Sequence, residues 1–166
     1  MKRWMIWELV LLIKYQIMII DEPFVTNAVK NSLAPKWGIV SEKELREHGC
    51  DLVLRDEENK NKARRFLIEC KGKSYAKSAR AVNETQWLYG LGQIITRMSV
   101  IAKHAYLYGL GLPEVSAKKA LKRIPWQAAR HLCLYIFSVD DNGKVTQYSP
   151  KDFKKFQKDN IKRYNA

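Results

Sequence analysis

The sequence predicts an α/β fold in which helices pack around a mixed β-sheet. Short apolar runs typical of strands, such as CDLVL, FLIEC and residues 132–139, alternate along the chain with segments whose apolar residues recur at helical spacing. CDLVL and FLIEC are separated by a charged stretch, which favours an antiparallel hairpin. The chain has 166 residues, enough for one domain with a substantial core.

The predicted elements follow the order helix, three strands, helix, strand, helix, two strands, helix. Asp21 or Glu22 opens the first helix, and Pro23 fits its first turn because the N–H that proline lacks is unpaired there anyway. Pro35 and Gly38 end this helix. Asn83 is predicted to cap the second helix. The strands are expected at 38–45, 50–54, 66–70, 105–110, 132–139 and 144–148, and the later helices at 83–98, 116–124 and 150–163.

Two segments are distinguished by composition: residues 1–20 are an apolar extension, and residues 21–166 are a single domain. The extension imitates a signal peptide or membrane anchor, but Glu8 and Lys14 interrupt it and the apolar run is shorter than the roughly 20 residues of a span. Packing on the domain or on a second subunit is therefore favoured over a membrane role. A second interpretation is that synthesis naturally begins at Met18.

The charge balance indicates a polyanionic partner. Lys and Arg number 30 against 17 Asp and Glu, which gives a formal net charge of +13. Such a balance attracts nucleic acid through a sequence-independent, salt-sensitive interaction, although a basic soluble surface without a partner is the alternative. The three cysteines, Cys50, Cys70 and Cys133, lack metal-ligand spacing, and so small an odd number is typical of reduced thiols in a cytoplasmic protein.

Candidate catalytic residues stand at the ends of the predicted hairpin strands. Asp51 opens one apolar run, and Glu69 and Lys71 close the next. Side chains at i and i+2 of a strand share a face, so Glu69 and Lys71 project together while Cys70 points the other way. Antiparallel pairing brings Asp51 near Glu69. Two carboxylates and an ammonium would then meet at one sheet edge, which suits a hard divalent cation beside a phosphate.

The acid-x-lysine spacing alone is weak, since it occurs three times, at Glu58–Lys60, Glu69–Lys71 and Asp152–Lys154. The first lies in the charged hairpin loop, and the third lies on the last helix, where i and i+2 do not share a face. Only the middle one ends an apolar strand and has an acid upstream on the partner strand. The alternative is an edge strand carrying ordinary surface charges.

The element order and these motifs resemble the PD-(D/E)xK nuclease superfamily, which has a restriction-endonuclease-like fold, and in particular its resolvase-like and XisH-like members. In the family a helix often supplies a first acid, the second strand carries an aspartate, the third carries the (D/E)xK, and in some branches the next helix carries a glutamine. The matching positions are Glu22, Gly49-Cys50-Asp51, Ile68-Glu69-Cys70-Lys71-Gly72 and Leu91-Gly92-Gln93. The chain departs from the family at Cys50, which replaces a proline as many members tolerate, and at Arg97, where RecB-like members have tyrosine.

The resemblance implies a Mg²⁺-dependent endonuclease that hydrolyses DNA phosphodiester bonds, with Mn²⁺ able to substitute. Asp51, Glu69 and the backbone carbonyl of Cys70 would hold the metal. Lys71 would orient or deprotonate the attacking water and help to neutralise the phosphate. Gln93 would position the lysine or the phosphate, or is simply a solvated polar residue of its helix. Glu22 would bind the metal through water or complete a second metal site, or is simply a first-turn acid favoured by the helix dipole.

The basic loop after the motif is expected to track the nucleic-acid backbone through Lys73, Lys77 and Arg80. No separate recognition domain is apparent, which favours structure-specific or weakly sequence-specific cutting, in recombination, repair, mobile-element or defence systems, with a homodimer presenting two active sites to two strands. The first alternative is a non-catalytic nucleic-acid-binding module that retains the fold. The second is a membrane-peripheral interaction protein, which the charges inside the apolar segment disfavour.

Overall fold

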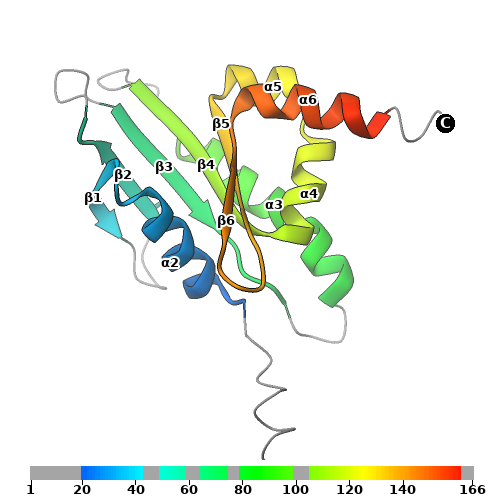
Figure 1. The fold of residues 1–166 in the computed structure, drawn as a ribbon, viewed down its shortest axis with the longest axis horizontal. Coiled ribbons are helices and arrows are strands. Elements are labelled where there is room, and N and C mark those ends of the chain that lie inside the picture. The colour runs from blue at the N-terminus through cyan, green and yellow to red at the C-terminus, as the bar shows by residue number, and fades with distance from the viewer. Residues whose placement is uncertain (1–19, 43–48, 59–63, 75–78, 99–104, 162–166) are drawn as a thin grey trace, which may run out of the picture.

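A computed structural model describes residues 20–42, 49–58, 64–74, 79–98 and 105–161 (Figure 1). Within these residues six strands form one sheet in the order β1-β2-β3-β4-β5-β6. The strands are β1 (Trp37–Glu42), β2 (Leu52–Asp56), β3 (Arg64–Cys70), β4 (Ala105–Pro113), β5 (Leu134–Val139) and β6 (Val145–Tyr148), and the helices are α2 (Glu22–Leu33), α3 (Ala79–Thr96), α4 (Glu114–Arg123), α5 (Trp126–His131) and α6 (Pro150–Ile161). The predicted fold class, a mixed sheet flanked by helices, is confirmed.

The sheet combines two kinds of strand pairing. β1, β2 and β3 pair antiparallel, β3, β4 and β5 pair parallel, and β6 returns antiparallel to β5. Parallel neighbours need a long crossover, which α3 supplies between β3 and β4 and the pair α4–α5 supplies between β4 and β5. The sheet therefore carries its parallel strands at the centre and antiparallel hairpins at both edges.

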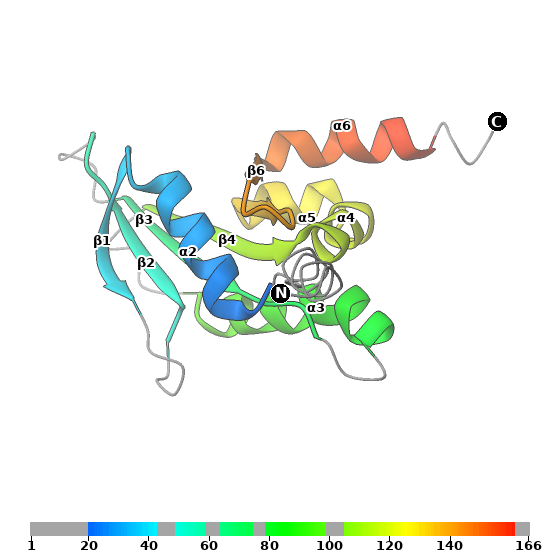
Figure 2. The same cartoon turned by 60° about the horizontal axis from the view of Figure 1, so that its bottom comes forward.

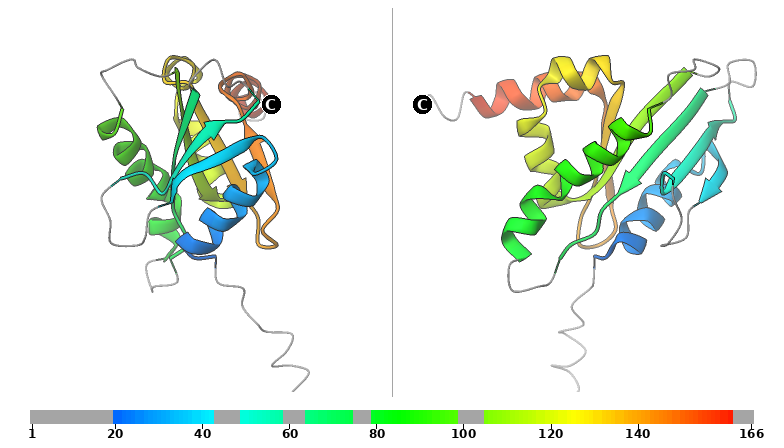
Figure 3. Two further views of the ribbon diagram at one scale, coloured as in Figure 1. Left: turned by 90° about the vertical axis from the view of Figure 1, so that its left-hand side faces the viewer. Right: turned by 180° about the vertical axis from the view of Figure 1, so that it is seen from behind.

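Helices cover both faces of the sheet and create two hydrophobic cores. Figure 2 and the right-hand view of Figure 3 show α2 and α3 on opposite sides of β3 and β4. The core on the α2 side includes Val25, Val29, Leu52, Phe66 and Phe137, all buried. The core on the α3 side also contains residues of α4, α5 and α6; among its members are Ile94, Leu110, Leu121, Ala129, Ile136 and Phe153. The alternation of strand residues between these two cores decides which side chains meet α3.

The start of α2 forms as its sequence predicts. Asp21 is the N-cap, and its side chain accepts a hydrogen bond of 2.9 Å from the Phe24 backbone N–H. The Ile20 side chain is buried, and its carbonyl accepts a 2.5 Å hydrogen bond from the Lys73 N–H. Residues 1–19 lie outside the described residues, so the apolar extension stays a prediction. No helix among the described residues is long and apolar enough to cross a membrane.

Three sequence predictions about elements need correction. α3 begins at Ala79, so Asn83 is inside the helix and is not its N-cap. Asn83 instead exchanges two hydrogen bonds with the backbone of Ser74, of 2.6 and 3.0 Å. Pro125 does not simply end a helix: it precedes the short helix α5, for which a fixed φ is favourable. β5 consequently starts at Leu134, two residues later than predicted, and residues 43–45 of the predicted first long strand lie outside the described part of the chain.

Candidate active site at the ends of β2 and β3

The register of the β2–β3 hairpin places the two motif acids side by side. Leu52 pairs with Ile68, and continuing this register by one residue, to Asp51 directly before β2, brings Asp51 opposite Glu69. Leu52 and Ile68 belong to the core on the α2 side, and their neighbours Val53 and Leu67 pack on the α3 side. Because side chains alternate along β3, Glu69 shares the α3 side with Leu67. Asp51, just before β2, lies near enough to Glu69 for its charge to raise the pKa of that carboxyl.

Asp51 is held by the backbone of the neighbouring strand. Its side chain is buried, with 8% of the residue surface exposed, and Oδ2 accepts a 2.6 Å hydrogen bond from the Cys70 N–H. The Lys71 N–H is bonded to the Gly111 carbonyl on β4, at 2.9 Å. Because successive N–H groups of a strand point to opposite edges, Cys70 directs its polar backbone groups toward Asp51. The Cys70 side chain is fully buried in the other core.

Glu69 lies between two cations although only 1% of its surface is exposed. Its Oε1 accepts a 3.0 Å hydrogen bond from Lys71 Nζ, and its Oε2 forms an ion pair with Arg97 Nη1. Burial raises the pKa of Glu69 above its ordinary value of 4.5, the Lys71 hydrogen bond lowers it, and the Asp51 charge raises it further. The buried Glu69 carboxylate is thus paired on both of its oxygens with cations, Lys71 and Arg97.

Lys71 joins Glu69 to the start of α2. Its Nζ also lies 3.3 Å from Glu22 Oε2. Burial lowers the pKa of Lys71, but the hydrogen bond and charge of Glu69, helped by Glu22, outweigh burial and hold the pKa above 10.5. The side chain is thus an ammonium at neutral pH. The structure brings Glu22, Asp51, Glu69 and Lys71 together as the sequence predicts.

Gly72 makes this close approach of α2 possible. A Cβ at this position would lie 2.7 Å from the Asp21 Cα and nearer still to the Asp21 carbonyl carbon and the Glu22 nitrogen. Since these are backbone atoms, they cannot swing away as a flexible side chain would. The absence of a side chain at Gly72 therefore lets the start of α2, and with it Glu22, sit against the strand that carries Lys71.

One face of α3 completes the cluster. Gly90 lies beside Lys71, since a Cβ on Gly90 would be 3.6 Å from Lys71 Cγ, and Arg97 reaches Glu69. Gln93 lies three residues after Gly90 on α3, so it shares this face, and Arg97 directly follows the last helical residue, Thr96. Its Oε1 is buried and has no hydrogen-bond partner among the described residues. An unpaired buried acceptor costs about 1–3 kcal/mol, so this atom is suited to a donor that a bound substrate or water supplies.

Arg97 pairs with Glu69, although its sequence position was notable only as a departure from the RecB-like tyrosine. The helix predicted over 83–98 would have placed it on the same face as Gln93, four residues earlier, although α3 itself ends at Thr96. Burial raises the pKa of the Cys50 thiol to about 11, and the nearby Arg97 partly opposes this rise. Arg97 therefore acts on residues of both halves of the motif: it pairs with Glu69 and lies near Cys50.

The described basic side chains of the predicted nucleic-acid loop, Lys73 and Arg80, pair with acids outside this cluster. Lys73 Nζ lies 3.3 Å from Asp141 Oδ1. Arg80 is 95% exposed and lies 3.6 Å from Glu84 Oε1. Lys77 falls in residues 75–78, outside the described part of the chain. Their contact with nucleic acid stays a prediction.

A metal would find oxygen donors here, but they are not arranged as a finished site. Among the described residues, no group of three or more His, Cys, Asp and Glu side chains forms a metal-binding cluster. One oxygen of Asp51, Oδ2, accepts a hydrogen bond from the Cys70 N–H, and both oxygens of Glu69 are paired with cations. Two carboxylates in register still form a hard-oxygen donor pair of the kind Mg²⁺ takes, completed in proteins by backbone carbonyls and waters.

Comparison with known proteins gives one structural similarity. No family model matches the sequence, and no curated protein matches it. The structure is similar to that of an XisH family protein from Nostoc punctiforme, with a TM-score of 0.46 and 14% sequence identity. The similarity covers 76% of this chain and 98% of the other.

Proposed function

We propose that this chain is a metal-dependent endonuclease of the PD-(D/E)xK type that hydrolyses DNA phosphodiester bonds with weak sequence specificity or structure specificity. One observation carries the proposal: Asp51, directly before β2, comes opposite Glu69 of the antiparallel strand β3, with the Lys71 ammonium 3.0 Å from Glu69. Two carboxylates beside one ammonium match what phosphodiester hydrolysis needs, which is a held cation and positive charge near the phosphate. The net charge of +13 supports a nucleic-acid substrate.

The donor set fits Mg²⁺, for which Mn²⁺ would substitute. Asp51, Glu69 and the Cys70 carbonyl would hold it, since all offer oxygen and Cys70 turns its polar backbone groups toward Asp51. When bound, such an ion polarises a phosphoryl oxygen and lowers the pKa of a water molecule. The buried, unpaired Oε1 of Gln93 supports the same assignment, because it offers an acceptor on the side of α3 that faces these residues.

Lys71 acts in this proposal as a cation and hydrogen-bond donor. A general base must be able to give up its proton near the working pH, and Glu69 and Glu22 instead hold the pKa of Lys71 above its ordinary value. Its ammonium would orient the attacking water or neutralise the phosphate. Arg97 would help, because a cation already placed at Glu69 can turn toward a phosphate once that carboxylate accepts the metal.

The test separates chemistry from binding. Lys71→Ala and Asp51→Asn should each abolish Mg²⁺-dependent cleavage of a panel of duplex, branched and single-stranded DNA. Lys71→Ala should leave DNA affinity nearly unchanged, because it removes one of 30 basic residues. Glu58→Gln is the matched control, since Glu58 belongs to an acid-x-lysine tripeptide but is exposed in the hairpin loop. Wild-type cleavage by either site variant would show that the assigned site is wrong.

A second candidate function is a non-catalytic nucleic-acid-binding module. The observation that favours it is the pairing of both Glu69 oxygens with cations, which must be rearranged before a metal can bind. Titration calorimetry with Mn²⁺ separates the two functions. Binding that Asp51→Asn weakens supports the nuclease, whereas DNA binding without any Mn²⁺ binding supports the module.

A further inference from the structure

A hollow lies away from the Asp51–Glu69 site, between α5, α6 and the start of β5. It has a volume of about 680 Å³, within the range of roughly 300–1,000 Å³ typical of small-ligand pockets. Trp126, Arg130 and Tyr135 line it, together with Lys151 and Lys154 of α6. We call it the Trp126 pocket. It shares no lining residue with the Asp51–Glu69 site.

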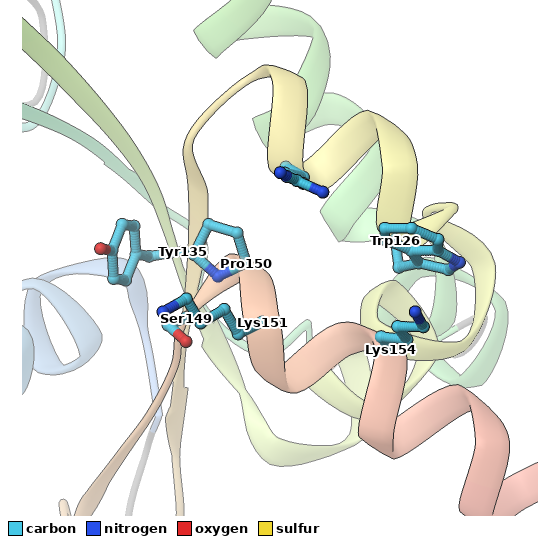
Figure 4. A pocket seen from close by; sticks show the side chains of 7 residues that line it. Trp126, Tyr135, Ser149, Pro150, Lys151 and Lys154 are labelled. Carbon is cyan, nitrogen blue, oxygen red and sulfur yellow. The ribbon is translucent and has the colours of Figure 1, made fainter.

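The Trp126 pocket combines aromatic walls with unpaired positive charge. Figure 4 shows Trp126 of α5 facing Lys154 of α6, with Tyr135 and Lys151 on the other side. Lys154 Nζ lies 4.6 Å from the centre of the Trp126 ring, a cation–π contact that holds the ammonium at the wall. Neither Arg130, Lys151 nor Lys154 forms an ion pair with another residue in the described part of the chain.

The acid nearest in sequence to these lysines is already engaged. Asp152, in the first turn of α6, accepts hydrogen bonds of 2.7 Å from both the backbone N–H and the hydroxyl of Ser149. These hydrogen bonds tie Asp152 to the residue just before α6, and Asp152 forms no ion pair with Lys151 or Lys154 in the described part of the chain. Three cations converging on a hollow without a carboxylate partner favour an anionic ligand, and a half-buried tryptophan adds a surface on which a flat ring can stack.

We propose that the Trp126 pocket binds one nucleotide of a nucleic-acid strand, with a phosphate against Arg130, Lys151 and Lys154 and a base against Trp126. This proposal rests on nucleic acid being the ligand of the proposed function, and it adds a second contact for the strand outside the cleavage site. The contact does not read sequence, because every base offers a flat face and every phosphate the same charge.

The first test compares matched charge losses on one helix. Lys151→Ala/Lys154→Ala removes two pocket cations, whereas Lys155→Ala/Lys158→Ala removes two exposed cations of α6 that do not line the pocket. Binding of a fluorescent single-stranded oligonucleotide is measured by anisotropy in EDTA at several salt concentrations. The pocket variant should flatten the slope of log K against log salt by up to about 0.7, the value for one phosphate contact on a single strand, and the control should not. Equal slopes for the two variants would overturn the proposal.

The second test concerns the base. Trp126→Ala should weaken binding of a normal oligonucleotide about 5- to 150-fold, the range for loss of one stacked base, and should weaken an abasic oligonucleotide far less. Because Trp126 also packs on the core, the wild-type protein provides an independent measurement: ultraviolet crosslinking of a 5-iodouracil oligonucleotide should label the pocket peptides of α5 or α6. Crosslinks found only on other peptides would contradict the proposal.

A third test, a competition experiment, asks whether the Trp126 pocket binds a nucleic-acid strand or a free nucleotide. A nucleoside monophosphate should displace the oligonucleotide only at concentrations far above those of the oligonucleotide itself; displacement at equal concentration would overturn the strand proposal. These measurements require neither metal nor cleavage. Failure of the pocket variants alone therefore refutes the pocket, whereas failure of Lys71→Ala and Asp51→Asn to stop cleavage refutes the proposed active site and leaves the pocket result intact.

Discussion

Replacing Gly72 with alanine should separate the start of α2 from the strand that carries Lys71. The new Cβ would lie 2.7 Å from the Asp21 Cα, whereas ordinary contacts begin at 3.4 Å. The start of α2 would therefore have to move by at least about 0.7 Å, and more to relieve the closer contacts with the Asp21 carbonyl and the Glu22 nitrogen. Its neighbouring contacts are the 2.5 Å hydrogen bond from Lys73 to Ile20 and the 3.3 Å pair between Lys71 and Glu22.

The magnitude follows from these contacts. Forcing extra volume into a packed backbone contact costs about 1–3 kcal/mol, and losing the Lys73–Ile20 hydrogen bond adds about 0.5–1.5 kcal/mol. We therefore expect Gly72→Ala to lower the free energy of unfolding by roughly 2–4 kcal/mol, as measured by urea unfolding followed by tryptophan fluorescence. Cleavage should fall as well, because Glu22 moves away from Lys71.

Gly92→Ala is the matched control for Gly72→Ala. Gly92 is exposed within α3, and a Cβ there meets no atom within 4 Å. The same chemical change should therefore stabilise the protein by roughly 0.5–1 kcal/mol, because alanine is the better helix former. If Gly72→Ala left the free energy of unfolding unchanged, or if the two variants shifted it in the same direction, the packing argument at Gly72 would be refuted.

Three further predictions concern charges and thiols near the site. Arg97→Met should lower the free energy of unfolding by about 1–3 kcal/mol in urea titrations, because Glu69 stays buried with one cation fewer; Arg97→Lys should recover part of this loss. The folded-state pKa of Glu69 is raised, so between pH 4.5 and that pKa the folded protein binds more protons than the unfolded chain and its stability falls as pH rises. Glu69→Gln should remove this fall in urea titrations from pH 4 to 7, and an unchanged pH dependence would contradict it. A thiol reagent at pH 7.5 should modify exposed Cys133 first, as read by peptide mass spectrometry, because Cys50 and Cys70 are buried and burial raises the pKa of Cys50 to about 11.

The sequence predicted the part of the structure that depends on local pattern. Alternation in CDLVL and FLIEC, with a charged loop between them, was sufficient for the β2–β3 hairpin and for the meeting of Asp51 with Glu69. The same alternation places Cys70 on the opposite face. Asp21 and Pro23 predicted the start of α2, because capping and proline geometry are decided by neighbouring residues.

Features that depend on contacts between distant segments were not predictable in this way. Asn83 has the composition of a helix cap, but its side chain bonds the Ser74 backbone across a loop. The six residues of α5 are too few for a helical period to be recognised beside Pro125. The ion pair of Arg97 with Glu69 requires the packing of α3 against β3, and the Trp126 pocket requires α5 and α6 to meet. Lys154, which belongs to the acid-x-lysine spacing on the last helix, lines this pocket.

The burial of Cys70 between Glu69 and Lys71 has a consequence for metal selectivity. Its sulfur is directed into the core, where a Cβ on Gly111 would meet it 2.6 Å away, and burial raises the pKa of the thiol, so it stays protonated. Soft ions such as Cd²⁺ and Cu⁺ depend on thiolate ligands, and this strand turns its thiol away from the two carboxylates. The hairpin thus carries a cysteine inside the motif without offering its sulfur to the ion proposed to bind at Asp51 and Glu69, so the ligands proposed for that ion are all hard oxygens.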